Sequence, residues 1–238
     1  MTLPRFRPTD ASLAPRYTGV RTFARLPHVA VPHEDVDAGT VPLVLGGDHS
    51  IVLGELRAHA RRHGPLGLVL LDAHADTWEQ YYGERYFHGT PFKRALEEGL
   101  IDPQRSLLAG MRGSLYAASD LDEPRGWGFE IVPCEELRTW TPEAYAARVR
   151  ERVGDGPAFL SFDIDVLDPA FAPATGTPEV CGLLPHEAIA FLRALRGQRF
   201  TGFDLVEVAP PYDTQAQLTA LTAANVAYEM VTLRALAP

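Results

Sequence analysis

The sequence is poor in cysteine, in long apolar runs and in clustered positive charge. Its two cysteines, Cys134 and Cys181, have no second Cys or His at zinc-finger spacing, so we expect two reduced thiols and neither a disulfide framework nor a zinc module. No apolar run approaches the roughly 18 residues that a membrane-spanning helix needs. The opening residues, MTLPRFRPTD, contain no apolar stretch of the secretory type. This predicts a cytoplasmic protein without a membrane partner.

Charge excludes another class of protein. The formal net charge is −9, and no basic cluster stands out along the chain. Proteins that bind nucleic acid draw most of their affinity from clustered Lys and Arg. We therefore expect no nucleic-acid partner.

The sequence does contain a regular alternation of short apolar runs and longer amphipathic stretches after residue 40. The runs predict strands over 42–47, 66–72, 106–110, 129–133, 158–165 and 200–208; the stretches predict helices over 51–62, 91–98, 142–153, 185–195 and 218–236. Nearly continuous apolar runs are typical of strands that are buried on both faces of a parallel sheet. We therefore predict an α/β domain over 41–238, with three α/β/α layers and a mostly parallel central sheet, after an N-terminal arm over 1–40.

Histidine and acidic residues follow four of the predicted strands. These segments are GGDHS (46–50), DAHAD (72–76), Asp163-Ile164-Asp165 and, after the last strand, Glu207. Because the carboxyl ends of parallel strands meet at one edge of a sheet, we expect these side chains to lie together. If the chain stays extended, residues i, i+2 and i+4 point to one side and the acidic and His residues of each segment converge.

Six of these groups form an oxygen-rich ligand set with two imidazoles and no thiolate: His49, Asp72, His74, Asp76, Asp163 and Asp165. A single Asp after a strand is commonly a cap or turn residue, but the combination at three strand ends is specific. Carboxylates gathered at one edge repel one another unless cations are present. Oxygen and imidazole donors suit Mn²⁺ better than structural zinc. We therefore predict two Mn²⁺ ions, which lower the pKa of a shared water and supply a hydroxide nucleophile near neutral pH.

These motifs resemble the signature motifs of the ureohydrolase family. GGDHS, DAHAD and SFDIDVLDP (161–169) carry the resemblance, which continues through AFAPATGTP (170–178) and runs almost continuously from residue 41 to the C-terminus. It implies an arginase-like fold, a binuclear manganese centre and a homo-oligomer, either a trimer or a hexamer. It also implies that His49 and Asp76 bind one ion. His74 and Asp165 would then bind the other, with Asp72 and Asp163 bridging both.

The resemblance also implies roles for residues outside the ligand set. His88, in YFHGTPF (86–92), is similar to the family's mobile histidine, which shuttles protons. Glu207, in VEVAP (206–210), is similar to the carboxylate that holds the guanidinium group. The hydroxide would attack the central carbon, and Asp76 and then His88 would help to protonate the departing amine. The alternative for His88 is simple packing within its aromatic loop.

Trp78 bears on which guanidino compound is the substrate. It stands two residues after DAHAD, where arginases carry an Asn that contacts the amino-acid end of the substrate. The segments 76–88 and 206–213 resemble agmatinases and guanidino-acid hydrolases instead. The resemblance therefore implies a small cationic guanidino substrate bound by Trp78, His88 and Glu207. Agmatine, which would give putrescine and urea, is the first choice, and guanidinobutyrate is the alternative.

The N-terminal region departs from the family pattern. Residues 16–27 resemble the arm of agmatinases, but only one short apolar run, 28–31, separates this arm from Gly46. In the family a long segment between them supplies a core strand and a loop near the substrate. A natural short form, an engineered deletion and an incomplete chain all fit this pattern. Two further hypotheses therefore stay open: a metal-binding remnant without activity, and a zinc-dependent deacetylase of related fold. Retention of His88 and Glu207 favours a working hydrolase.

Overall fold

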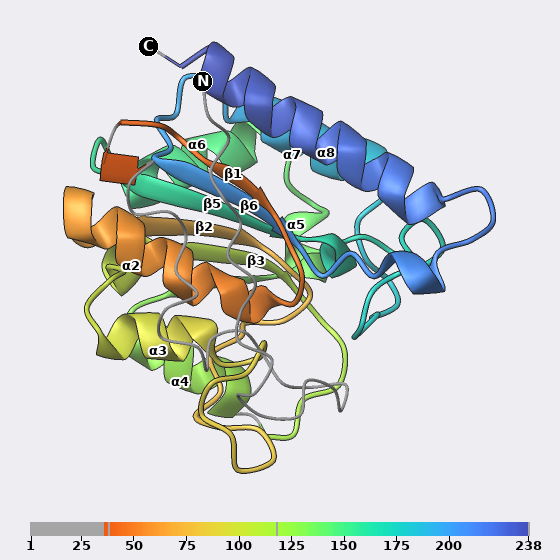
Figure 1. The fold of residues 1–238 in the computed structure, drawn as a ribbon, viewed down its shortest axis with the longest axis horizontal. Coiled ribbons are helices and arrows are strands. Elements are labelled where there is room, and N and C mark those ends of the chain that lie inside the picture. Colours follow the sequence, from red (N-terminus) through yellow and green to blue (C-terminus); the bar gives the residue numbers. More distant parts are fainter. Residues whose placement is uncertain (1–35, 38, 118, 238) are drawn as a thin grey trace, which may run out of the picture.

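The computed structural model describes residues 36–37, 39–117 and 119–237, and its centre is a parallel sheet (Figure 1). The strand order is β1-β6-β5-β2-β3-β4. The strands are β1 (Leu43–Leu45), β2 (Gly67–Leu71), β3 (Leu107–Met111), β4 (Glu130–Pro133), β5 (Ala158–Asp163) and β6 (Gly202–Val206). Every neighbouring pair is parallel. Most of the predicted N-terminal arm, including the apolar run 28–31, lies outside the described residues.

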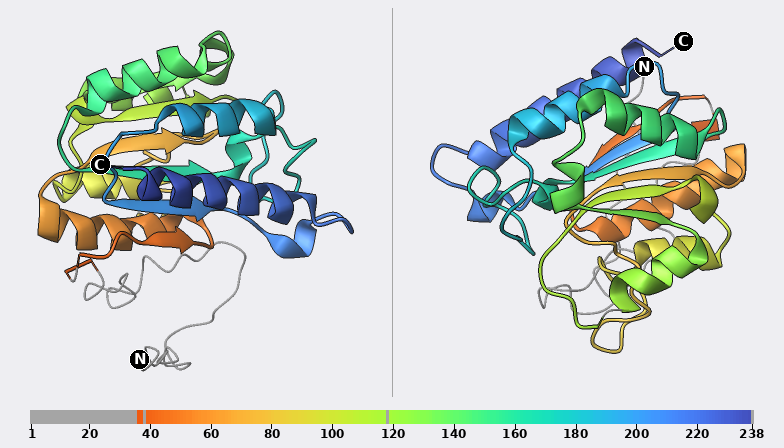
Figure 2. Two further views of the ribbon diagram at one scale, coloured as in Figure 1. Left: turned by 90° about the horizontal axis from the view of Figure 1, so that it is seen from above. Right: turned by 180° about the vertical axis from the view of Figure 1, so that it is seen from behind.

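Helices cover both faces of the sheet (Figures 1 and 2). The helices are α2 (Val52–His63), α3 (Pro91–Glu97), α4 (Ser119–Trp127), α5 (Cys134–Leu137), α6 (Pro142–Val153), α7 (Pro185–Ala194) and α8 (Leu218–Ala235). α2, α3 and α4 lie on one face, whereas α6, α7 and α8 lie on the other. The predicted three-layer α/β/α architecture is therefore confirmed. None of the described helices is both long enough and apolar enough to cross a bilayer.

The central strand β2 explains why the apolar runs are continuous. Leu68 and Leu70 pack in the core beneath α2 and α3, whereas Val69 and Leu71 pack in the core beneath α6 and α7. All four side chains are fully buried. Successive residues of a strand point to opposite faces, so a strand with helices on both sides needs apolar residues at every position.

Sequence signals also fix where helix α6 begins and ends. The Thr141 side chain accepts a hydrogen bond from the Ala144 backbone N–H at 3.2 Å, and Pro142 occupies the first turn. Both features satisfy or remove donors that a helix start leaves unpaired. Gly154, with φ 65°, stops the helix in a conformation that glycine adopts readily.

Two predicted strands end earlier than expected, and this corrects the extended-chain hypothesis. β2 stops at Leu71, just before DAHAD, and Asp76 has φ 51°. β5 stops at Asp163 and is followed by a 3-10 turn, Ile164–Val166. The ligand segments are therefore turns, and simple alternation along a strand does not bring their side chains together.

β1 forms an edge of the sheet among the described residues. It is three residues long, and the Leu45 side chain is 67% exposed. It pairs with β6, and no described strand pairs with its outer side.

Candidate active site

The predicted site residues gather beyond the carboxyl ends of four neighbouring strands, β1, β6, β5 and β2. After β1, Asp48 accepts a hydrogen bond from the Ser50 backbone N–H at 3.0 Å and so caps a 3-10 turn that begins at His49. Gly46 leaves room for the Ile51 side chain, because a Cβ at position 46 would lie 2.1 Å from Ile51 Cδ1 and would force that side chain to move. The GGDHS motif therefore folds His49 back over the sheet edge.

β2 and β5 end in the same local turn. Asp72 Oδ1 accepts a hydrogen bond from the His74 backbone N–H at 2.6 Å, and Asp163 Oδ1 accepts one from the Asp165 N–H at 2.8 Å. Such Asx turns need an acceptor two residues before the donor. This spacing, and not an extended strand, explains the D-x-H and D-x-D motifs. The first carboxylate of each motif fixes the turn and presents its other oxygen to the site.

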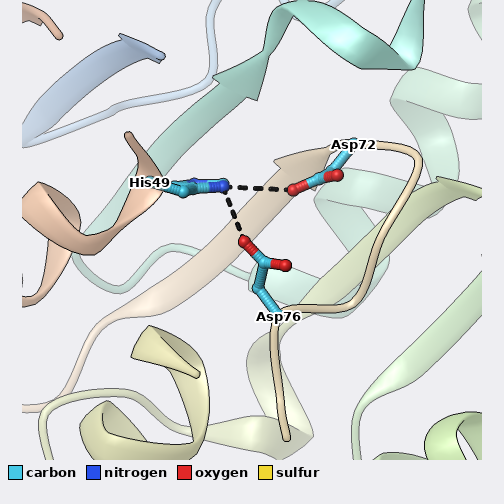
Figure 3. Close-up of side chains that lie close together, drawn as sticks. All are labelled: His49, Asp72 and Asp76. Atoms are coloured by element: carbon cyan, nitrogen blue, oxygen red, sulfur yellow. Dashed lines mark ion pairs between the residues drawn. The ribbon is translucent and has the colours of Figure 1, made fainter. Parts of the chain in front are cut away.

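His49 is fully buried and faces three carboxylates. Its Nδ1 lies 3.1 Å from Asp72 Oδ2, 3.0 Å from Asp76 Oδ2 and 3.3 Å from Asp163 Oδ2. Figure 3 shows the first two of these carboxylates converging on the ring nitrogen. The ring's other nitrogen, Nε2, lies 2.8 Å from Ser161 Oγ. The tautomer that donates to Ser161 leaves Nδ1 free to act as a ligand atom.

A second group lies beside the first and shares Asp72 with it. His74 Nδ1 is 3.5 Å from Asp72 Oδ1 and 3.1 Å from Asp165 Oδ2. The sets His49–Asp72–Asp76 and Asp72–His74–Asp165 each place three donor atoms within 4.8 Å of one another, as a metal site requires. We call these residues together with Asp163 the His–Asp cluster. The structure brings all six predicted ligands together.

Negative charge dominates the His–Asp cluster. Burial acts to lower the pKa of His49, but Asp163, Asp72 and Asp76 outweigh it and raise that pKa well above its usual value. The same competition raises the pKa of His74, where burial is outweighed by Asp165 and Asp72. Carboxylates that hold protons on two imidazoles create a strong local demand for positive charge. Divalent cations would meet this demand.

Glu207 and His88 lie together next to the cluster. His88 Nδ1 is 3.8 Å from Glu207 Oε1, and the same oxygen accepts a hydrogen bond from the His49 backbone N–H at 2.7 Å. Burial raises the pKa of Glu207 to about 8. Glu207 and Asp76 have φ values of 61° and 51°, which cost non-glycine residues free energy and are concentrated at functional sites.

Trp78 lies beside His88 in the wall of a cavity of about 390 Å³ that also reaches His74 and Asp76. The Trp78 backbone N–H donates to the Gly89 carbonyl at 3.0 Å, so the intervening loop folds back on itself. This brings together Trp78 and His88, two residues predicted to bind substrate. Their roles remain predictions.

Sequence reasoning gave no role to two residues that contact the cluster. Ser161 bonds to His49, and Thr177 Oγ1 donates to Asp165 Oδ2 at 3.3 Å. Ser161 carries a usable signal, because it stands two residues before Asp163 on the same strand and so faces the same side. Thr177 comes from a distant loop and carries no comparable signal.

Comparison with known proteins decides the family. The arginase family profile matches residues 28–232. The chain belongs to the arginase family. It is 49% identical over 196 residues to "Agmatinase, mitochondrial" of Gallus gallus, covering 82% of this chain and 57% of that protein. It is 46% identical to "Guanidinobutyrase" of Pseudomonas aeruginosa, covering 89% of this chain and 67% of that protein.

Solved structures agree with this assignment. Proclavaminate amidino hydrolase from Streptomyces clavuligerus superposes with a TM-score of 0.79 at 41% identity, over 87% of this chain and 69% of that one. An arginase from Bacillus subtilis superposes with a TM-score of 0.74 at 27% identity, over 83% of this chain and 73% of that one. The predicted ureohydrolase resemblance and arginase-like fold are confirmed. This arginase-family chain spans a little over half the length of the agmatinase that it matches.

Proposed function

We propose that this chain is a manganese-dependent hydrolase that releases urea from a guanidino compound, with agmatine as its substrate and putrescine as the second product. The observation that supports this most strongly is the pair of donor groups that share Asp72. Relatives whose names describe agmatine, guanidinobutyrate and proclavaminate amidino chemistry support the reaction class.

The donor atoms fit two divalent cations. His49 Nδ1 and Asp72 Oδ2 are buried, and although they lie 3.1 Å apart, neither makes a hydrogen bond of acceptable geometry with described residues. A cation shared by both atoms would satisfy them. We propose that His49 and Asp76 hold one ion and that His74 and Asp165 hold the other. Asp72 and Asp163 would bridge the two ions.

The chain's own groups supply the rest of the mechanism. When bound, two Mn²⁺ ions lower the pKa of a water molecule and so provide a nucleophile near neutral pH. The Glu207 carboxylate orients the planar guanidinium by charge-assisted hydrogen bonds. The positive charge of the guanidinium favours the ionised form of this carboxylate despite its burial. Addition of a water oxygen to the central carbon, followed by cleavage of the bond from that carbon to the alkyl nitrogen, gives urea. The amine departs with a proton delivered through Asp76 and His88.

One observation supports a second candidate. The chain spans 57% of the length of the Gallus gallus agmatinase that it matches, so a metal-binding protein without a complete substrate pocket is the alternative. Guanidinobutyrate is the alternative substrate if the chain is an enzyme, because a relative of that name is 46% identical. We further propose that the chain is cytoplasmic and forms a homo-oligomer, either a trimer or a hexamer. Light scattering would test the oligomeric state.

The test is urea release from agmatine, guanidinobutyrate and arginine with Mn²⁺. We expect urea from agmatine, abolished by a chelator and by Asp163→Asn. Asp155→Asn is a matched control, because Asp155 is an exposed carboxylate that lines a different cavity. Manganese bound without urea from any substrate would favour the non-catalytic alternative.

A further inference from the structure

The cavity beside the His–Asp cluster is lined by more than the cluster itself. Its walls include His74, Asp76 and His88 from the predicted site, together with Tyr116, Asp120 and Glu179. We call it the aromatic cavity. A guanidino group that reacts at the cluster would leave the remainder of its molecule, the tail, in this space.

One wall of the aromatic cavity is built from stacked rings. The Trp78 ring lies nearly parallel to the Tyr81 ring, with 5.4 Å between the ring centroids. It lies edge-on to the Tyr116 ring, with 5.3 Å between the centroids. The hydroxyl oxygens of Tyr81 and Tyr116 are 3.5 Å apart. Aromatic faces pack against methylene groups and attract cations, because the ring quadrupole is negative at the face.

Arg112 is a cation in the wall, but its donors are already used. Its Nε donates to the Val180 carbonyl at 3.0 Å, and Nη2 donates to the carbonyls of Asp165 at 2.6 Å and Glu179 at 2.7 Å. Nη1 donates to Val166 at 3.2 Å. A guanidinium whose three nitrogens all serve backbone carbonyls has little left to offer a carboxylate ligand.

The acidic groups in the wall are differently placed. Among the described residues, the Glu179 carboxylate makes no hydrogen bond or ion pair, whereas the Glu179 carbonyl accepts from Arg112. A Cβ on Gly113 would come within 2.2 Å of its Cδ, so this carboxyl group lies directly over the loop after β3. Asp120 Oδ2 accepts from the Tyr116 backbone N–H at 2.9 Å. The cavity wall therefore contains, besides the predicted site residues, two carboxylates and one guanidinium whose donors are taken.

We propose that the aromatic cavity binds the substrate's tail, and that Glu179, assisted by Asp120 and the ring wall, selects a tail that ends in a cation over one that ends in a carboxylate. This inference rests on the proposed function, because it takes the guanidino group to lie at the His–Asp cluster. It favours guanidinoalkylamines as substrates and disfavours guanidino acids.

Three ligands that share one guanidinobutyl skeleton test this charge preference. Agmatine ends in an ammonium, butylguanidine in a methyl group and 4-guanidinobutyrate in a carboxylate. We would measure their binding to the manganese-loaded full chain by calorimetry. We expect agmatine to bind most tightly and 4-guanidinobutyrate most weakly. Glu179→Gln should weaken the binding of agmatine about fivefold, as expected for loss of a partly exposed ion pair. It should leave the affinity for butylguanidine unchanged. Added salt should weaken the binding of agmatine to the wild type more than its binding to this variant.

A control and a second variant keep the test specific. Glu143→Gln removes one exposed charge from the first turn of α6, outside the cavity. It should leave the binding of all three ligands unchanged. Asp120→Asn should act like Glu179→Gln with a smaller effect. Equal weakening of all three ligands by Glu179→Gln would overturn the proposal, as would tightest binding of 4-guanidinobutyrate or no binding of any ligand.

Urea release separates this proposal from the proposed function. A chain that binds agmatine selectively but releases no urea would support the tail site and refute the catalytic assignment. Urea released from all three ligands at similar kcat/KM, with similar binding, would refute the tail site alone.

Discussion

The described part of the chain contains two groups of buried ionisable side chains that differ in what surrounds their histidine. The first is the His–Asp cluster at the sheet edge. The second, which we call the α2 cluster, consists of Glu55 and His59 on α2 and Asp204 on β6. All three side chains are fully buried, and none of their carboxylate oxygens or ring nitrogens has a hydrogen-bond partner among the described residues.

The pKa of the buried histidine distinguishes the two groups. In the His–Asp cluster three carboxylates surround His49 and raise its pKa despite burial. In the α2 cluster burial lowers the pKa of His59 to about 4. His59 packs edge-on against Phe159 at 5.3 Å, as a neutral core side chain does. A buried histidine whose ring nitrogen faces carboxylate oxygens is therefore a ligand candidate. His59, whose ring packs on His63 and Phe159, is part of the core.

The largest expected effect is that of metal on stability. Each ion at about 100 times its Kd stabilises the folded state by about 2.7 kcal/mol, so two ions give about 5 kcal/mol, or a Tm rise of about 10–20 °C for a chain of this size. Differential scanning calorimetry with Mn²⁺ and with chelator measures this. Asp72→Asn should remove most of the shift, whereas Asp204→Asn should keep it. A shift lost equally in both variants would contradict the contrast between the clusters.

The second prediction concerns pH and the α2 cluster. Burial raises the pKa of Asp204 to about 6, so the folded state holds more protons than the unfolded state and stability falls as pH rises from about 4 through 6. Burial lowers the pKa of His59 to about 4, so the unfolded state holds more protons and stability falls as pH drops from about 6.5 through 4. The two effects oppose each other, each with a size of about 3 kcal/mol.

Single variants should therefore reveal opposite slopes. In urea unfolding of metal-free protein, the stability of Asp204→Asn relative to wild type should rise with pH between about 4 and 6. The relative stability of His59→Leu should rise as pH falls through about 6.5 toward 4. Parallel profiles for the two variants would show that these groups do not titrate as burial dictates.

The sequence predicted the elements well and their ends poorly. All six predicted strands are present, as are all five predicted helices, because apolar runs buried on two faces leave a strong pattern. The strand ends were wrong where Asp72 and Asp163 start Asx turns, since propensity does not show which acceptor a backbone N–H will choose. Helix α4, SDLDEPRGW, was missed because it has few apolar residues and contains Pro124.

The site divides in the same way. Its six candidate ligands and Glu207 were predicted because they follow strands whose ends must meet, whereas His88 was predicted only from the family resemblance. The α2 cluster was not predicted, because Glu55 in VLGELRAHARRH occupies what looks like an ordinary polar position of an amphipathic helix. Its burial arises only when α2 packs over β6 beside Asp204. Contacts between distant segments, such as Thr177 with Asp165, likewise depend on tertiary packing.

The third prediction removes a buried charge from the α2 cluster. Burial and the neighbouring Asp204 raise the pKa of Glu55 well above its usual value. Replacing an unpartnered buried carboxyl group with an apolar side chain of similar size should stabilise the protein by about 2 kcal/mol at pH 8. The gain should be smaller at pH 5, because a larger fraction of the group is protonated at the lower pH. Chemical denaturation of Glu55→Leu at both values measures this. Destabilisation at both would mean that an ordered water satisfies Glu55 in the wild type.

The smallest effect is expected at Ser161, which joins the two regions. Its hydroxyl lies 2.8 Å from His49 Nε2, and Ser161 on β5 is the strand partner of Asp204 on β6. Outer hydrogen bonds fix the orientation of metal-binding histidines, and their loss typically costs about 10–100-fold in metal affinity. We expect Ser161→Ala to weaken Mn²⁺ binding about tenfold, as measured by competition with a chromogenic chelator. Ser106→Ala is the matched control, because Ser106 is an equally buried serine that bonds to the Leu68 backbone at the opposite sheet edge. The Ser106→Ala variant should lose stability without losing metal affinity. Equal losses of metal affinity in both variants would mean that Ser161 acts only through the fold.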